Sequence, residues 1–396
     1  MSNALKVFLT LALTAMVMGG FARVAKAQDV FTVQNDDVYL GYNGQFNSGS
    51  TYINAVYHGK LSTGSYGLGG SYFGVSTVNI DLTSGGKCVF IADAAGVSGS
   101  GPGDIASFDF PNFIANYTSN FGGNGDFYGI TLADSGSVLV AGWTASGTLE
   151  TFNVGPGCTL TMGTSITTSG LNGGPIDGLA VASNGKFIAL TYDDGSYSAV
   201  ALHGANLGIV SGPHFSNCAN TLGLQPTGVA IDPSSLYVYM DCFGGVTATI
   251  DAYNVNTPAQ TVTNGPLNAA GGKAVYGSNT MALSPDGKIL YIVGTFSGSV
   301  ETAQVNGTSV EANSCRNASL PGYDSQWLYP GSINVGGGKA GGDGAVVAEA
   351  GYGYTANSYI EFLTSSGSEP DICVSPDKQG IDTNSEFALS AASYAK

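Results

Sequence analysis

The stretch Met281-Ala-Leu-Ser-Pro-Asp-Gly-Lys-Ile-Leu-Tyr-Ile-Val293 decides the fold of this chain. It consists of an apolar run, a short polar segment centred on Gly287, and a second apolar run. Asp-Gly pairs accept the backbone angles of a tight hairpin turn, and the flanking residues favour strands. The stretch therefore predicts a β-hairpin of two short antiparallel strands.

The same hairpin pattern returns along the whole chain. Its turns use Asn-Gly, Asp-Gly, Ser-Gly or Pro-Ser, which suit tight turns for the same backbone reason. The clear copies are Leu179–Leu190 and Val229–Met240. Slightly shifted copies are Ile130–Val140 and Val78–Ile91, and the two weaker copies are Val30–Tyr42 and Ile333–Ala350.

The turns of these hairpins are evenly spaced, 49 to 52 residues apart. Each hairpin is followed by two more strand-like stretches, for example Thr148–Val154 and Cys158–Gly163. Four strands in about 50 residues are typical of a propeller blade, which buries both faces only when it is stacked in a closed ring. The turns centre on Asp36, Gly85, Gly136, Gly185, Ser235, Gly287 and Gly337.

This repeat predicts an all-β fold, a seven-bladed β-propeller with four antiparallel strands per blade. Residues 28–396 are expected to form a single domain. An open β-solenoid has much shorter coils, and two β-sandwiches would not keep seven equal units, so both alternatives fit less well. The tail after Asp377 is less regular, and the sequence leaves open whether the tail or the N-terminal strand closes the ring.

The hairpin Ser284–Val293, with its echoes at Ser183–Lys186 and Asp232–Tyr239, resembles the YVTN-type and lactonase-like bacterial seven-bladed propellers. The likeness covers most of the chain after residue 27 as repeat architecture. Some lactonase-like members open sugar-derived lactones, including phosphorylated ones. The shared motif is a structural hairpin, however, and no catalytic set of residues can be carried over to this sequence.

Residues 1–27 have the pattern of a secretory signal peptide. Lys6 supplies the positive start, Val7–Ala22 is uncharged and largely apolar, and Ala25–Ala27 is a small-x-small cleavage site. The apolar run is shorter than the roughly 20 residues that a membrane span needs. We therefore expect an extracytoplasmic protein (secreted, periplasmic or at the cell surface) without an integral membrane segment after cleavage.

The chain is strongly acidic, with a formal net charge of −16, and Arg316 is the only arginine after residue 27. Such a protein is repelled by phosphate backbones and anionic lipids, so nucleic acid and anionic membranes are excluded as expected partners. The scarcity of arginine also disfavours a phosphosugar site.

The six cysteines predict disulfides in an exported chain, with fifteen ways of pairing them. Cys218 and Cys242 are the expected pair, because they are near in sequence and lie in consecutive repeats. Buried free thiols are the alternative.

The sequence carries few groups for chemistry. His58, His203 and His214 are the only histidines, and the last two fall in the outer part of one repeat. No serine-hydrolase elbow, phosphate-binding loop or zinc motif is present. We expect no cofactor. Calcium at Asp193-Asp194-Gly195 or Asp36-Asp37 is an alternative, although neither continues with EF-hand spacing.

One face of the predicted propeller gathers aromatic and polar residues. Loops that enter the first strand of a blade share this face with loops that join the second strand to the third. Aromatic rings beside carboxylates and amides suit sugars and also protein interfaces, while aromatics that plug gaps between blades are the alternative. The predicted ligand-binding rim comprises Tyr128, Trp143, Asp177, Tyr192, Asp193, Asp241, Tyr276, Asn279, Trp327 and Tyr329.

Together these features predict an exported, non-catalytic propeller that binds a glycan or protein partner through its loop-bearing face. The first alternative is a lactonase-like hydrolase that acts on a sugar-derived lactone with rim carboxylates as acid and base. The second is a cell-surface assembly protein whose copies pack side by side. The sequence favours a binding protein over an enzyme without deciding between them.

Overall fold

The computed structural model of the protein describes the backbone of every strand named below, between Asp29 and Tyr394. Side chains are described at Cys88, Phe90, Ile105 and Ser107 and over much of the middle of the chain. Those further described residues are 130–133, 136–142, 147–174, 176, 178–182, 184–217, 228–234, 236–242, 249–258, 262–264, 281–284, 286–293 and 300–312.

The hairpin predicted over Met281–Val293 is present, as β23 (Met281–Leu283) and β24 (Ile289–Gly294) in antiparallel pairing. In its turn, the Ser284 hydroxyl accepts the Ile289 amide at 3.0 Å and donates to Asp286 at 2.7 Å. Gly287 has φ +75°, a conformation that side chains rarely adopt. The hairpin prediction is confirmed together with the residue types that form its turn.

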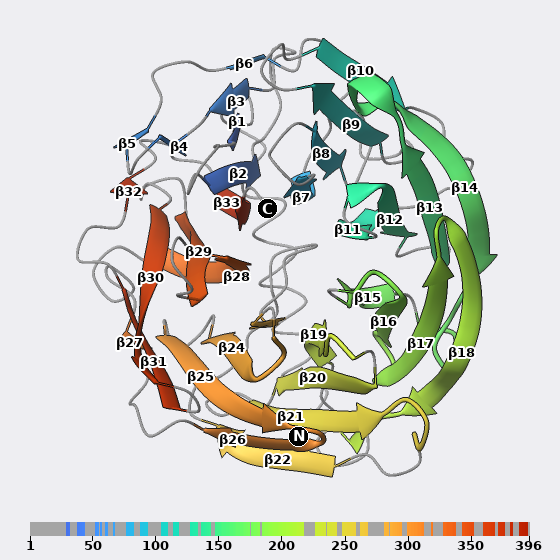
Figure 1. The fold of residues 1–396 in the computed structure, drawn as a ribbon, viewed down its shortest axis with the longest axis vertical. Coiled ribbons are helices and arrows are strands. Elements are labelled where there is room, and N and C mark those ends of the chain that lie inside the picture. Colours follow the sequence, from blue (N-terminus) through green and yellow to red (C-terminus); the bar gives the residue numbers. More distant parts are fainter. Residues whose placement is uncertain are drawn as a thin grey trace, which may run out of the picture.

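The best-described sheet shows the repeating unit. It consists of β15 (Ile176–Val181), β16 (Phe187–Tyr192), β17 (Ser196–His203) and β18 (Asn206–Phe215), paired antiparallel in chain order. The first strand lies nearest the axis and the fourth lies at the outside (Figure 1).

Other sheets repeat this order along the chain. Before it come β7 (Thr77–Leu82), β8 (Cys88–Asp93), β9 (Asp104–Asp109) and β10 (Ile114–Thr118), then β11 (Phe127–Ala133), β12 (Val138–Trp143), β13 (Thr148–Val154) and β14 (Leu160–Thr167). After it come β19 (Pro226–Ile231), β20 (Tyr237–Phe243), β21 (Ala248–Asn254) and β22 (Val262–Leu267).

The remaining sheets carry extra strands. The hairpin β23–β24 continues into β25 (Ser299–Asn306), β26 (Ser309–Ala312) and β27 (Ala318–Ser319). The next sheet holds β28 (Leu328–Gly337), β29 (Asp343–Gly351), β30 (Tyr359–Ser368), β31 (Asp371–Pro376) and β32 (Ile381–Asp382). The N-terminal sheet holds β1 (Asp29–Phe31), β2 (Val38–Asn43), β3 (Tyr52–Asn54), β4 (Val56–Tyr57), β5 (Lys60–Leu61) and β6 (Tyr66–Gly67).

The sheets stand side by side around a common axis, so the fold is an all-β propeller, as the repeat predicted (Figure 1). Four antiparallel strands in chain order form each regular blade. The N-terminal sheet departs from this order, with β1 and β3 paired in parallel, and the count of seven blades stays a prediction.

The C-terminal strand joins the N-terminal sheet. β33 (Ala388–Tyr394) pairs antiparallel with β2, in a register that places Val38 opposite Tyr394. It also contacts β7 and β28, the first strands of the sheets on either side. Because this strand lies far along the chain from its partner, its pairing joins the two ends of the propeller, a point that the sequence left open.

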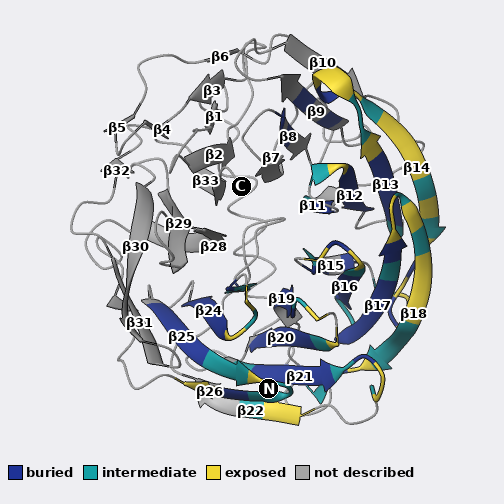
Figure 2. Cartoon of the chain, viewed as in Figure 1, coloured by how far each residue is buried: buried dark blue, intermediate teal, exposed yellow. Residues whose placement is uncertain are grey.

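The described core lies between neighbouring sheets (Figure 2). Five tyrosines are among its largest fully buried side chains. Aromatic rings bury a large apolar area, so these tyrosines contribute much of the packing between blades. They are Tyr192, Tyr197, Tyr239, Tyr253 and Tyr291.

Side-chain hydrogen bonds also cross from each described blade to the next. Thr151 donates to the Ala205 carbonyl at 2.5 Å, and Tyr197 donates to the Pro258 carbonyl at 3.0 Å. Tyr239 donates to the Gly307 carbonyl at 2.8 Å. Each acceptor lies in or beside the turn between the third and fourth strands of the following sheet, so the outer hairpin of one blade is fixed on the blade before it.

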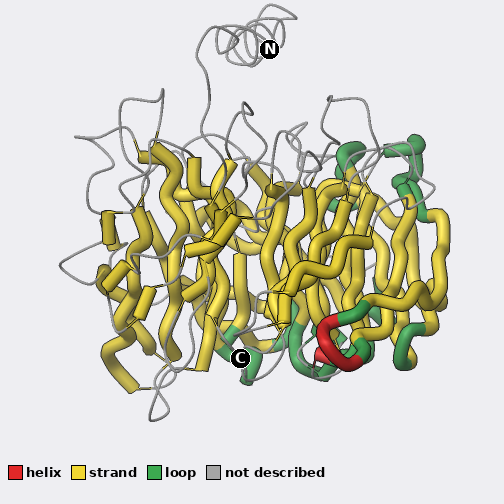
Figure 3. Tube along the Cα trace, turned by 90° about the horizontal axis from the view of Figure 1, so that it is seen from above, coloured by secondary structure: helices red, strands yellow, loops and turns green. Residues whose placement is uncertain are grey.

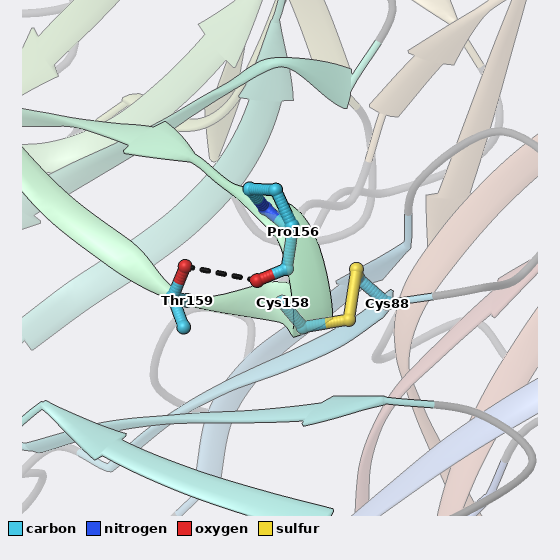
Figure 4. The surroundings of a disulfide bond; sticks show 4 residues. All are labelled: Cys88, Pro156, Cys158 and Thr159. Carbon is cyan, nitrogen blue, oxygen red and sulfur yellow. Dashed lines mark hydrogen bonds between the residues drawn. A yellow bond between two sulfur atoms is a disulfide. The ribbon is translucent and has the colours of Figure 1, made fainter.

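A disulfide joins two consecutive sheets (Figure 4). It links Cys88, the first residue of β8, to Cys158 in the short 3-10 helix η2 (Pro156–Cys158). This pair was not predicted. Cys242 is also disulfide-bonded, and its partner lies outside the described residues, as Cys218 does. The pairing of Cys218 with Cys242 therefore stays a prediction.

The expected signal peptide, residues 1–27, lies outside the described residues. In the part of the chain that is described, no helix has the length and apolar character of a membrane-crossing segment.

Candidate functional site

Loops gather at the two ends of the upright strands (Figure 3). At one end, the connection after β14 meets the turn between β16 and β17. We call residues 168–174 the clamp loop and residues 193–195 the β16–β17 turn. This is the end that the sequence predicted to carry the rim, and we call it the loop-bearing end.

Asp194 fastens the clamp loop to the β16–β17 turn. Its carboxylate accepts the Asn172 amide at 2.7 Å, the Ser196 amide at 3.0 Å and the Ser196 hydroxyl at 2.5 Å. The Ser196 hydroxyl oxygen in turn accepts the Leu171 amide at 3.2 Å. A Cβ atom at Gly170 or Gly174 would lie within 2.3–2.9 Å of Asp194 atoms, so glycine is needed at both positions.

The hydrogen bonds to Asp194 also set its ionisation. Partial burial raises the pKa of this carboxyl, but donation from Ser196, Asn172 and Gly174 outweighs burial and holds the pKa below its usual value. Asp194 is therefore a charged anchor at neutral pH, and its negative charge strengthens the bonds that it accepts.

The clamp loop presents a small mixed surface to solvent. Leu171 is 44% exposed, Asn172 and Gly173 are exposed, and Asp193 in the adjoining turn is half-buried. An apolar side chain and an amide thus lie on a loop whose backbone is held in place, with a carboxylate in the adjoining turn. Such a loop can form contacts without first having to become ordered.

Two predicted rim residues are buried. Tyr192 ends β16, is 1% exposed and packs in the core between the β11–β14 and β15–β18 sheets. Asp241 in β20 is fully buried. Neither side chain reaches solvent, so the expectation that they line an open rim is wrong. The alternative reading, that aromatics at strand ends fill gaps between blades, holds for Tyr192, and its burial raises the pKa of its hydroxyl.

The other predicted rim residues are placed only in part. Asp193 lies in the β16–β17 turn, beside the clamp loop. Four more belong to strands whose backbone is described, and their side chains are outside the described residues. Those four are Tyr128, Trp143, Asp177 and Tyr329. Tyr276, Asn279 and Trp327 lie wholly outside the described residues. A role for these seven stays a prediction.

The described region offers little for metal or histidine chemistry. Among its residues, no group of three or more His, Cys, Asp or Glu side chains is placed to hold a metal ion. The carboxylate of Asp194, one of the residues considered for calcium, accepts N–H and O–H donors, and calcium there stays an alternative. Asp36, Asp37 and His58 lie outside the described residues. His203 and His214 occupy the outer strands β17 and β18, as predicted.

Buried carboxyl groups recur at one register position that the sequence analysis missed. Glu150, Asp251 and Glu301 each lie in the third strand of a blade, opposite Ala141, Met240 and Ile292 of the second strand. All three are at most 7% exposed, and Asp251 accepts a hydrogen bond from Thr263 at 2.7 Å. Their common register, counted from the hairpin turns, is the signal in the sequence that could have located them.

No protein-family model matches the chain, and a search of curated proteins finds no relative of its sequence. Solved structures do match it, and those described here have low sequence identity to it. A Lactobacillus plantarum protein has a TM-score of 0.61 at 12% identity, over 91% of this chain and 99% of that one. A candidate 6-phosphogluconolactonase of Bacteroides uniformis has a TM-score of 0.59 at 14% identity, over 91% of this chain and 99% of that one.

A β-propeller domain from Myceliophteria thermophila also matches, with a TM-score of 0.54 at 9% identity over 80% of this chain and 96% of that one. Identities this low bear on the fold alone. The fold, the strand order and these neighbours define the class of protein: the chain is an all-β propeller. Its architecture is similar to that of lactonase-like propellers, and the narrower YVTN assignment stays a resemblance.

Proposed function

We propose that this protein is an exported binding propeller that recognises a glycan or protein partner through its loop-bearing end. The observation that carries the proposal is the clamp loop. Asp194 fixes the backbone of this loop, and the loop exposes Leu171 and Asn172 beside Asp193. An ordered loop with mixed apolar and polar groups is the usual form of a recognition surface on a rigid scaffold.

The second candidate function is hydrolysis of a sugar-derived lactone, as in the lactonase-like resemblance. The names of two structural neighbours, candidate 6-phosphogluconolactonases from two Bacteroides species, favour it. Its acid and base would be carboxylates of the predicted rim such as Asp177, Asp193 or Asp241, of which Asp241 is fully buried. The acidic charge of the chain also disfavours a phosphorylated substrate.

One experiment separates these functions. The purified protein is applied to a mixed glycan array, with and without calcium, and the same sample is assayed for hydrolysis of simple sugar lactones. Asn172→Ala and Leu171→Ser change the exposed side chains of the clamp loop and keep its backbone bonds. Leu236→Ser is the matched control, because Leu236 is 37% exposed in the hairpin turn at the opposite end.

Specific glycan binding that the two clamp-loop variants weaken, and that Leu236→Ser leaves unchanged, supports the binding function. Turnover of a lactone without such binding supports the hydrolase. Glycan binding that survives both clamp-loop variants contradicts the placement of the site. If the array shows no binding, the protein and the same variants are each immobilised, and the amount of protein partner that each retains is compared.

A further inference from the structure

The outermost strands of two consecutive sheets form a surface without charge. We call residues 160–167 of β14 and 206–215 of β18 the outer wall. The chain has 28 acidic and 12 basic residues, yet neither strand contains one. The charge-free sequence extends well beyond the strands, over residues 151–176 and 195–231. These two stretches therefore contribute no acidic, lysine or arginine side chain to this side of the propeller.

Exposed residues follow both strands of the outer wall (Figure 2), and large apolar side chains are among them. Met162 is 53% exposed, Ile209 56%, Val210 47% and Phe215 44%. Among the described residues only three other large apolar side chains are exposed, and they lie apart from one another in Leu171, Leu236 and Val262. A gathering of apolar groups on one side of a soluble protein indicates an interaction surface.

A β-bulge accounts for two neighbouring exposed side chains. Ile209 pairs with Val200 and Ser211 pairs with Ala199, which leaves Val210 as an extra residue. A bulge breaks the regular ladder of an edge strand. Pro213, which lacks an amide hydrogen, interrupts the same edge further on. The edge of β18 is therefore unsuited to pairing with an added strand, and its contacts must come from side chains.

The two strands of the outer wall are fixed to each other. The Thr164 hydroxyl of β14 donates to the Ala205 carbonyl at 2.6 Å and accepts the Leu207 amide at 3.1 Å. These bonds lock the hairpin that begins β18 onto the preceding blade. The wall is thus one continuous surface across two sheets, and docking on it would not require the sheets to rearrange.

We propose that the outer wall is the contact surface of a symmetric homodimer, in which a second copy of this chain docks with its own outer wall. Two copies of a chain with net charge −16 repel each other over most of their surface. They can approach without burying like charges only where both surfaces are uncharged, and the outer wall meets this condition for both partners at once. A cationic partner would gain nothing here, because the wall offers it no counter-charge.

The two strands of the outer wall are long. Eight and ten residues of strand are about 26 and 33 Å long at roughly 3.3 Å per residue. A two-fold contact of a surface with itself also closes, so association stops at two copies.

Sedimentation velocity of the purified protein, from about 1 to 200 µM and at low and high NaCl, tests this proposal. We expect a monomer–dimer equilibrium that tightens as salt rises, because salt screens the repulsion between the acidic surfaces and leaves the apolar contact intact. Ile209→Lys and Met162→Lys, one on each strand, should each weaken dimerisation at least tenfold, since each buries a charge in the contact.

The control is Leu236→Lys, which adds the same charge to a similarly exposed leucine outside the outer wall. Because added lysine lowers the net negative charge, it should leave dimerisation unchanged or slightly tighter. A monomer at every concentration, oligomers larger than two, looser association at high salt, or equal weakening by Leu236→Lys would each overturn the proposal. Circular dichroism confirms folding, and Phe215→Ser replaces any lysine variant that does not fold.

Discussion

The ring of Tyr197 in β17 stacks on the ring of Tyr253 in β21, with centroids 3.8 Å apart and planes inclined by 29°. The two residues belong to consecutive blades, and both are fully buried. Their hydroxyl groups differ: that of Tyr197 donates to the Pro258 carbonyl, whereas that of Tyr253 has no hydrogen-bond partner. This pair shows how the blades are joined, and the difference between the hydroxyls can be measured.

Phenylalanine substitutions should separate the two hydroxyls. Tyr253→Phe keeps the stacked ring and removes a buried unpartnered group, so stability should stay the same or rise by about 1 kcal/mol. Tyr197→Phe leaves the Pro258 carbonyl without its donor and should cost about 1 kcal/mol. Urea unfolding measures both. A loss of stability in Tyr253→Phe as large as in Tyr197→Phe would contradict this assignment.

The buried tyrosines should make the protein sensitive to alkali. Burial raises the pKa of Tyr253 well above its ordinary value, and Tyr239 shifts in the same direction, chiefly through burial. Tyrosine in the unfolded chain ionises near pH 10. The stability that these groups contribute is therefore complete below about pH 10 and is lost as the pH rises toward their folded pKa values. Urea unfolding from pH 7 to 11 should show this decline, and Tyr253→Phe should make it shallower.

The clamp loop should depend on the charge of Asp194. Asp194→Asn keeps the shape of the side chain but weakens its hydrogen bonds to Asn172 and Ser196, so amide hydrogen exchange should rise over residues 170–174. Asp193→Asn, one residue away, is the matched control and should leave exchange there unchanged. Since the folded pKa of Asp194 is lowered, its contribution is present above the ordinary carboxyl pKa and is lost as the pH falls through the folded value. Equal exchange in both variants would show that the clamp is not electrostatic.

Close packing of the outer hairpin on the preceding blade should make Gly163 sensitive to substitution. A Cβ atom at Gly163 would lie 2.7 Å from the Ala205 Cβ and 2.6 Å from the Thr151 hydroxyl oxygen. Gly163→Ala should therefore cost about 1–3 kcal/mol through overpacking. Gly208→Ala in the neighbouring outer strand meets nothing within 4 Å and should have little effect. Thermal unfolding of the two variants makes the comparison, and similar losses in both would argue against the tight contact.

The Cys88–Cys158 disulfide should stabilise the junction of two blades. It closes a loop with a sequence separation of 70, for which chain entropy predicts a contribution of about 4 kcal/mol. Cys88→Ser with Cys158→Ser should lower the free energy of unfolding by about 2–4 kcal/mol under oxidising conditions. The same variant should respond less than the parent protein to a reducing agent, and an equal response would show that the reductant acts on another pair.

The hairpins were predictable because they are local. Asp286-Gly287 and the apolar runs beside it act within a dozen residues, and glycine is needed at Gly287 by its own backbone conformation. The even spacing of such turns then predicts blades, since no single hairpin sheet can bury both of its faces. The repeat also predicts that His203 and His214 lie in the outer strands of a blade, because they fall in the third and fourth strands after a hairpin turn.

The candidate site was less predictable, because the sequence shows where a residue falls along a strand but not how the blades pack. Tyr192 and Asp193 are neighbours at the end of β16, yet one is buried between sheets and the other lies half-buried beside the clamp loop. Asp194 looked like a turn residue, and its partner Asn172 lies 22 residues earlier. Strand alternation decides which of Tyr192 and Asp193 is buried. The partner of Asp194 is decided by a contact between segments that are separate in the chain.

The sequence by itself determined the all-β class, the four-strand repeat and the lack of charged residues in β14 and β18, because each depends on residues close together in the chain. Only the tertiary structure decided that β33 pairs with β2, that Cys88 bonds to Cys158, and which tyrosines are buried. These features join segments about 50 to 350 residues apart, and their partners are chosen by the closure of the ring and the packing between sheets.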